Sequence, residues 1–295
     1  MDLQNYLKVL KEKDKLYLKT NEITQTILKE IYSEAKKTMG AKKFLKEIGS
    51  SKQIFREIIN GKIFPSLRLL EKIETTSKID ISETFFNSSE FMRGKTHSTI
   101  IKFPKKITPD LLYLFGAIRD GSLVHYANVY EIEYGQKIRE WLDNSITPRL
   151  KKVFDVETKS YLRKNKNFVI RKRSVAMFNV INYFLGFPET NYKKTPLIAF
   201  NIPFEMQKYY IAGFYDAEGC KYPKDITFYQ QWYNNKGCPP LIDIKEMLEK
   251  INIKTHFRIK PQNKAYLYDL HVEAESRKKF IEKIPIEHPI FLQNL

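Results

Sequence analysis

Residues 209–220 read YYIAGFYDAEGC, and residues 111–123 read LLYLFGAIRDGSL. Both stretches are apolar, contain small residues, and end in an acidic residue followed by glycine. Each predicted helix carries its small residues on one stripe, with Gly116 in the first and Gly213 in the second. Two helices approach closely only where side chains are small. We therefore expect these two helices to pack against each other, which brings the acidic residues at their ends together.

Those acidic residues are Asp120 and Glu218. Residues 211–219, IAGFYDAEG, match in residue type the nine-residue signature of the LAGLIDADG homing endonucleases, and the chain resembles that family. The resemblance identifies the acid before the final glycine as the metal ligand, which is Glu218 in the second copy and Asp120 in the first. Asp216, the earlier acid, is expected to cap the helix or to pair nearby.

The first copy departs from the signature in two ways. Gly116 lies four residues before its acid, whereas Gly213 lies five residues before Glu218. Arg119 stands where the signature has a small residue. Both departures bear on whether the first half of the site is catalytically competent.

One order of elements follows both motifs. After the first motif, alternating patterns predict strands, then a helix over residues 136–154 with a boundary at Pro148, then strands at 159–164 and 168–173, then a helix at 174–185. The order repeats after the second motif, with Ile226–Gln230 as the surer strand of its first pair. The sequence thus predicts an α+β fold of two pseudosymmetric αββαββα half-domains, at residues 106–200 and 201–295. The resemblance implies that they form a DNA-binding saddle, in a monomer with internal pseudo-twofold symmetry.

The N-terminal region, residues 1–80, has the pattern of a small all-α domain. At about residues 21–76 it resembles phage-repressor helix-turn-helix domains, with helices at Ala41–Ile48 and Ser51–Asn60 around the turn Gly49-Ser50. The second helix would enter the major groove, where side chains such as Gln and Arg pair with base edges. Its exposed face offers Lys52, Gln53 and Arg56. Residues 81–105 are rich in polar residues and are predicted to be a linker with one strand near Ser98–Phe103. A plain helical bundle remains the alternative for the N-terminal region.

Charge points to a polyanionic partner. The formal net charge is +17 over 295 residues, and residues 149–173 hold ten basic and two acidic side chains. Basic side chains on strands suit phosphate contacts. The side chains expected to contact DNA in the two half-domains are Lys159, Arg163, Arg171, Arg173, Arg258 and Lys260. A solvated charged surface is the alternative for the basic stretch.

No apolar run approaches the length of a membrane span, and the start of the chain has no signal-peptide pattern, so we expect an intracellular, cytoplasmic protein. The two cysteines and five histidines show no zinc-ligand spacing.

The resemblance implies a site-specific, metal-dependent DNA endonuclease that acts on an asymmetric double-stranded target. Magnesium prefers oxygen ligands, so we expect two or three Mg²⁺ ions at Asp120 and Glu218. Gln230 is a candidate for orienting a water. Two other functions stay open: a non-catalytic, sequence-specific DNA-binding transcriptional regulator on the same fold, to which Arg119 beside Asp120 points, and an RNA-binding splicing helper.

Overall fold

The computed structural model describes residues 13–94, 99–164, 166–185, 195, 199, 201–220, 225–263 and 265–292. The chain divides into two compact units. Unit 1 comprises Met1–Lys105 with Arg173–Asn179, and unit 2 comprises Lys106–Lys172 with Val180–Leu295. Unit 2 therefore holds most of both predicted half-domains, whereas Arg173–Asn179 of the first half-domain belongs to unit 1.

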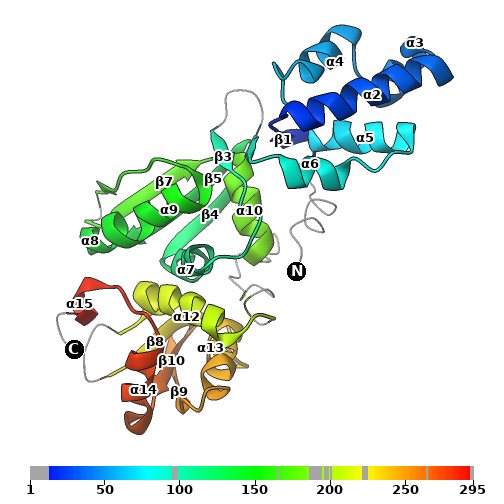
Figure 1. Ribbon diagram of the computed structural model, residues 1–295. Coiled ribbons are helices and arrows are strands. Elements are labelled where there is room, and N and C mark those ends of the chain that lie inside the picture. The colour runs from blue at the N-terminus through cyan, green and yellow to red at the C-terminus, as the bar shows by residue number, and fades with distance from the viewer. Residues whose placement is uncertain are drawn as a thin grey trace. The chain divides into compact units, whose positions relative to one another are not determined.

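Unit 1 is mainly helical, with a small antiparallel sheet in the order β1-β2-β3 (Figure 1). Its core includes an aromatic cluster, in which the rings of Phe44 and Phe55 meet edge to face at 5.8 Å. Its elements are η1 (Lys13–Lys15), β1 (Tyr17–Leu18), α2 (Glu22–Thr38), α3 (Ala41–Ile48), α4 (Lys52–Ile59), α5 (Leu67–Ser77), α6 (Ser82–Ser88), β2 (Phe91–Arg93) and β3 (Ile100–Lys102).

Local signals set the ends of α3 and α4. Gly49 ends α3 in the left-handed conformation, φ 68°, and its N–H donates to the carbonyls of Leu45 and Lys46. Glycine takes this conformation without a Cβ penalty. Ser51 then caps α4 by accepting from the N–H of Ile54. The two predicted helices and the turn between them are therefore present.

The prediction of a linker at residues 81–105 is wrong. This segment contains α6, β2 and β3 and belongs to unit 1. Phe85, Met92 and Ile101 are buried there, each with an exposed fraction of 0%. The strands are only three residues long, too short to produce a readable alternation in a polar sequence. The predicted strand is β3, at Ile100–Lys102.

The first half of unit 2 begins with α7, whose start is set by the Thr108 cap and by Pro109 at the first helical position. A four-stranded antiparallel sheet follows in the order β4-β5-β7-β6. The elements are α7 (Pro109–Ala117), η2 (Ile118–Asp120), β4 (Gly121–Tyr126), β5 (Val129–Gln136), α8 (Arg139–Trp141), η3 (Leu142–Ile146), α9 (Thr147–Phe154), β6 (Tyr161–Leu162), β7 (Phe168–Arg173) and α10 (Val175–Leu185).

Pro148 changes the hydrogen bonding of the long helix without ending it. The five residues of η3, directly before α9, form a π-helical turn. Proline has no N–H to donate, and its ring displaces the carbonyl of the preceding turn, so a wider turn before it accommodates the ring. The predicted helix is thus continuous from Arg139 to Phe154.

The second half repeats this order. Its sheet has the order β8-β10-β9, and an isolated bridge joins Gly219 to Phe228. Figure 1 shows α13 and α14 beside this sheet. The elements are α12 (Phe204–Glu218), β8 (Thr227–Trp232), α13 (Pro239–Glu249), β9 (Thr255–Gln262), β10 (Ala265–Val272), η4 (Ala274–Ser276), α14 (Arg277–Lys283) and α15 (Pro289–Leu292). The predicted α+β class, with antiparallel sheets and two similar halves, is confirmed. Within the described residues, no helix combines the length and apolarity needed to span a bilayer.

Candidate functional site

The two motif helices, α7 and α12, touch backbone to backbone. A Cβ added at Gly116 would lie 2.2 Å from the carbonyl oxygen of Tyr210, and one added at Gly213 would lie 2.1 Å from that of Tyr113. No side chain fits at either distance. The predicted close approach is therefore present, and glycine is required at both positions.

The contacts at this crossing are symmetric. Gly116 meets residues three before and one after Gly213, namely Tyr210 and Phe214. Gly213 likewise meets residues three before and one after Gly116, namely Tyr113 and Ala117. A local twofold relation therefore pairs Gly116 with Gly213, although the two glycines stand at different distances in sequence from their acids.

A 3₁₀ turn compensates for this difference. Five α-helical steps lead from Gly213 to Glu218, an axial advance of about 7.5 Å at the standard rise. On the other side, α7 ends at Ala117 and the last three residues up to Asp120 form η2. Because a 3₁₀ helix rises by roughly 2.0 Å per residue, one α-helical and three 3₁₀ steps also advance about 7.5 Å. By these ideal rises the backbones of Asp120 and Glu218 are expected at a similar height above the crossing. The turn η2 packs against α12.

Glu218 is half-buried at the end of α12. The preceding residue, Ala217, accepts a 3.3 Å hydrogen bond at its carbonyl oxygen from Nε2 of Gln136, a buried residue at the end of β5. The first half thus holds the end of the second motif. Gln136 could not be found from the sequence, because its partner is a backbone atom 81 residues away. The side chain of Asp120 lies outside the described part of the structure.

Asp216 is fully buried and ties the crossing to the C-terminal segment. Its carboxylate accepts hydrogen bonds from the hydroxyl of Tyr113 at 2.5 Å and from the backbone N–H groups of Glu287 and His288 at 2.9 and 3.2 Å. Burial raises the pKa of Asp216 to about 7, against the opposing effect of these three hydrogen bonds. Asp216 therefore pairs internally, as expected, and is separate from the acid at the helix end.

Comparison with known proteins identifies the second motif. Residues 205–285 match the family model of the LAGLIDADG-like domain. The chain is also 28% identical over 149 residues to the homing endonuclease I-ApeI of Aeropyrum pernix, covering 49% of this chain and 67% of that protein.

Among solved structures, I-DmoI in complex with DNA and Ca is 19% identical, with a TM-score of 0.49 over 62% of this chain and 92% of that one. The homing endonuclease I-WcaI bound to its DNA recognition sequence is 15% identical, with a TM-score of 0.42 over 64% of this chain and 88% of that one.

In the second half, strand register separates the two faces of the sheet. Phe228 contacts the ring of Phe280 in α14, so alternate residues from Phe228 face the helices. Gln230 is one of them, because it lies opposite Tyr268. Its Oε1 is buried and has no hydrogen-bond partner among the described residues. This position does not fit the predicted water-orienting role.

Arg258 and Lys260 lie on the opposite face of this sheet. The cross-strand partner of Arg258 is Asp269, which is 1% exposed and binds Nζ of Lys260 at 2.8 Å. His271 lies on the same face, with its Nδ1 2.8 Å from the hydroxyl of Thr227. Part of the charge of Lys260 is therefore compensated within the protein, whereas Arg258 is exposed.

The first-half sheet has a similar acid–base network. Glu133 on β5 is 8% exposed and binds Arg163 at 2.5 Å and Arg171 at 2.8 Å. Arg171 also binds Glu131 at 3.0 Å. These arginines are held in fixed positions by buried carboxylates. Sequence reasoning identified the arginines but not the glutamates, because alternation along β5 indicates a face and not a partner.

Much of the basic stretch at residues 149–173 has internal partners. Arg149 lies 3.9 Å from the ring centroid of Tyr113 and binds Glu287. Lys152 binds Asp110 at 2.6 Å. The charge run therefore overstates the free positive surface, although Lys159 and Arg173 are exposed as expected.

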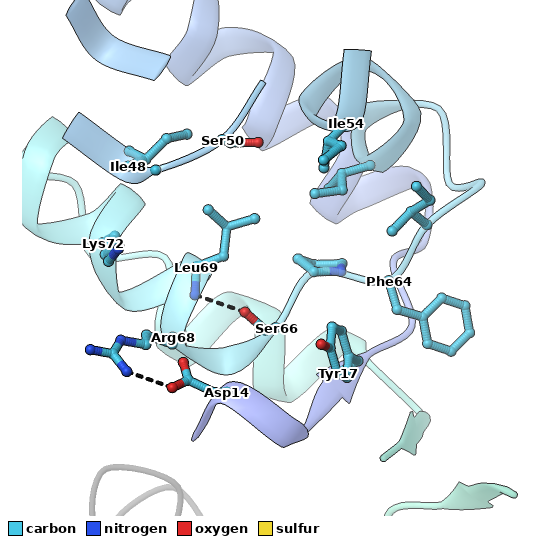
Figure 2. Close-up of a pocket in the computed structure, with 14 residues that line it drawn as sticks. Asp14, Tyr17, Ile48, Ser50, Ile54, Phe64, Ser66, Arg68, Leu69 and Lys72 are labelled. Atoms are coloured by element: carbon cyan, nitrogen blue, oxygen red, sulfur yellow. Dashed lines mark hydrogen bonds and ion pairs between the residues drawn. The ribbon is translucent and has the colours of Figure 1, made fainter. Parts of the chain in front are cut away.

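In unit 1, Lys52, Gln53 and Arg56 are all exposed on α4. A different side of this helix, which carries Ile54 and Ile58, borders a cavity of about 360 Å³. Figure 2 shows Ile54 and Leu69 at this cavity, and Arg68 bound to Asp14 at its rim. The three predicted DNA-contacting side chains lie outside the cavity lining.

Proposed function

We propose that this protein is a site-specific, metal-dependent double-stranded DNA endonuclease. The observation that supports the proposal is the glycine crossing, where the two motif helices touch backbone to backbone within one compact unit. The similarity to I-ApeI, whose name describes it as a homing endonuclease, supports the same function.

Asp120 and Glu218 would hold the metal. Their carboxylates are the hard oxygen donors that magnesium prefers, and DNA phosphates with water would complete the coordination shells. When bound, the ions would lower the pKa of a water and stabilise charge on the phosphate.

The protein's own residues would bind and orient the DNA. Arg258 is exposed on the second sheet, while Arg163 and Arg171 are held by Glu133 on the first. A guanidinium fixed by a carboxylate keeps its direction, so less side-chain freedom is lost when it meets a phosphate or a guanine. The two sheets differ in sequence, which suits an asymmetric target. The exposed face of α4 would add contacts on one flank.

A non-catalytic regulator is the alternative function. Its motivation was the cation next to Asp120, and the Arg119 guanidinium instead contacts Tyr210 and Phe214 inside the protein. These contacts give the Arg119 guanidinium partners other than Asp120.

The decisive test is selection of cleaved sites from a randomised duplex DNA pool, with Mg²⁺ or with EDTA. The wild type is compared with an Asp120→Asn, Glu218→Gln double variant. We expect cuts only for the wild type and only with Mg²⁺. Enrichment of bound sites without cuts, equal in both proteins, would overturn the nuclease and support the regulator.

A further inference from the structure

Arg119 is the side chain that the LAGLIDADG signature does not predict. It lies in the middle of η2, the 3₁₀ turn that ends in Asp120, and is 2% exposed. A buried guanidinium requires partners, because an unpaired buried charge is strongly unfavourable. Its contacts therefore show what the substitution does.

Two contacts of Arg119 reach the second half. Nη2 of Arg119 donates a 3.0 Å hydrogen bond to the hydroxyl of Tyr210. The guanidinium carbon lies 5.1 Å from the ring centroid of Phe214, a cation–π distance. The hydroxyl of Tyr210 in turn donates to Thr195 at 3.3 Å. Arg119 thus joins the end of the first motif to the middle of α12.

An acidic side chain lies near the same network. Burial raises the pKa of Asp243 in α13, while the Thr195 hydroxyl and the Arg119 guanidinium act in the opposite direction. The Arg119 guanidinium therefore interacts electrostatically with Asp243, in addition to its hydrogen bond to Tyr210.

The end of the second motif is held by a different contact. There α12 stays α-helical to its end, and the residue before the acid is Ala217, held through its carbonyl by Gln136. The first motif is one residue shorter and must extend through η2 to reach the same height. Short 3₁₀ segments have poorer hydrogen-bond geometry than α-helix, so a tertiary contact is needed to hold one in place.

We propose that Arg119 is the positioning residue for Asp120: its bond to Tyr210 holds the 3₁₀ turn that compensates for the missing residue. The inference rests on the proposed nuclease function. It predicts that the nicking rates of the two target strands depend differently on Arg119, because only Asp120 lies on the 3₁₀ turn that Arg119 holds.

The test uses full-length protein and a supercoiled plasmid carrying the selected site. Tyr210→Phe removes the hydroxyl but keeps the ring, and Tyr209→Phe makes the same change one residue earlier on α12 as the control. Strand-specific primer extension reports each nicking rate. Asp120→Asn first shows which strand depends on Asp120.

We expect Arg119→Ala and Tyr210→Phe to slow nicking of that strand by about 10- to 100-fold, since small displacements of catalytic groups have effects of this size. The other strand, and both strands in Tyr209→Phe, should keep the wild-type rate. Arg119→Lys, which retains a donor and the charge, should recover part of the loss. Equal slowing of both strands, or no slowing, would overturn the positioning role.

A second readout needs neither metal nor DNA. The N–H of Gly121 donates to the carbonyl of Ile118 in η2, and that of Gly219 donates to Tyr215 at the end of α12. In Arg119→Ala, amide hydrogen exchange should accelerate about tenfold at Gly121 and stay unchanged at Gly219. Equal change at both glycines would indicate general loosening and contradict the inference. If the wild type cuts neither strand, the nuclease proposal fails, and the exchange experiment still decides whether Arg119 holds the turn.

Discussion

At the scale of single residues, the site depends on two glycines and on one buried acid. Gly116 and Gly213 let two backbones touch, and Asp216 bonds the crossing to the C-terminal segment. The sequence indicated the glycines because they recur beside acid-glycine endings. It could not give the partners of Asp216, because two of them are backbone N–H groups about 70 residues away.

Gly213→Ala should lower the free energy of unfolding by about 3 kcal/mol, because the new Cβ would lie 2.1 Å from a carbonyl oxygen. Helix propensity alone gives the opposite sign, since alanine stabilises a helix by about 1 kcal/mol relative to glycine. Urea unfolding measures the sign directly. A more stable variant would show that the helices do not cross at this position.

The raised pKa of Asp216 predicts that the free energy of unfolding depends on pH. Its pKa of about 7 in the folded protein lies above the usual value near 4 in an unfolded chain, so the folded state holds the proton more tightly. The stability that this group contributes is therefore fully present below about pH 4 and is lost as the pH rises through about 7. Between pH 5 and 8 the wild type should lose more stability than Asp216→Asn, measured by urea unfolding. Parallel pH profiles would contradict the raised pKa.

At the scale of elements, apolar patterns and end signals such as Thr108 and Pro109 predicted the helices and most strands of unit 2. The α3 and α4 helices were predicted from Gly49 and Ser51, which act locally. Of the short strands of unit 1, β1 and β2 were missed, and so were the π-turn η3 and the 3₁₀ turn η2. Both turns differ from α-helix in which carbonyl each N–H reaches. Pro148 follows η3 and accounts for it, whereas the sequence of η2 holds no such local signal. Gln230 was misplaced because residue alternation does not show which face a helix covers.

The first-half sheet depends on its buried acid–base network. Arg171→Gln should lower the free energy of unfolding by about 1–3 kcal/mol, because it leaves two buried glutamates with less compensating charge. Lys172→Gln, the next residue on β7, is the matched control and should change stability by less than about 0.5 kcal/mol. Urea unfolding of the three proteins tests this, and equal effects of the two variants would show that the glutamates tolerate the loss.

At the scale of the whole molecule, the net charge of +17 predicts a steep salt dependence of DNA binding. With 6–10 phosphate contacts, affinity should fall by about 10³- to 10⁵-fold between 50 and 200 mM salt. Fluorescence anisotropy on the selected duplex measures the slope. A flat response would argue that the internal ion pairs leave too little free charge to bind phosphates.

Unit 1 predicts an extended recognition site. A triple Ala variant at Lys52, Gln53 and Arg56 should shorten the nuclease-protection footprint on one flank of the DNA and leave the cut positions unchanged. The reason is that these exposed side chains belong to a different compact unit from the glycine crossing. An unchanged footprint would support a plain helical bundle.

The contact between Arg119 and Tyr210 also limits how halves of this protein could be combined with halves of its relatives. A hybrid that takes its first half from this chain inherits a shortened motif, and a new second half would have to supply a hydroxyl where Tyr210 stands. Donors that lack it should yield hybrids that nick a single strand. For anyone who builds custom nucleases from exchangeable halves, residues 119 and 210 would have to be transferred as a pair.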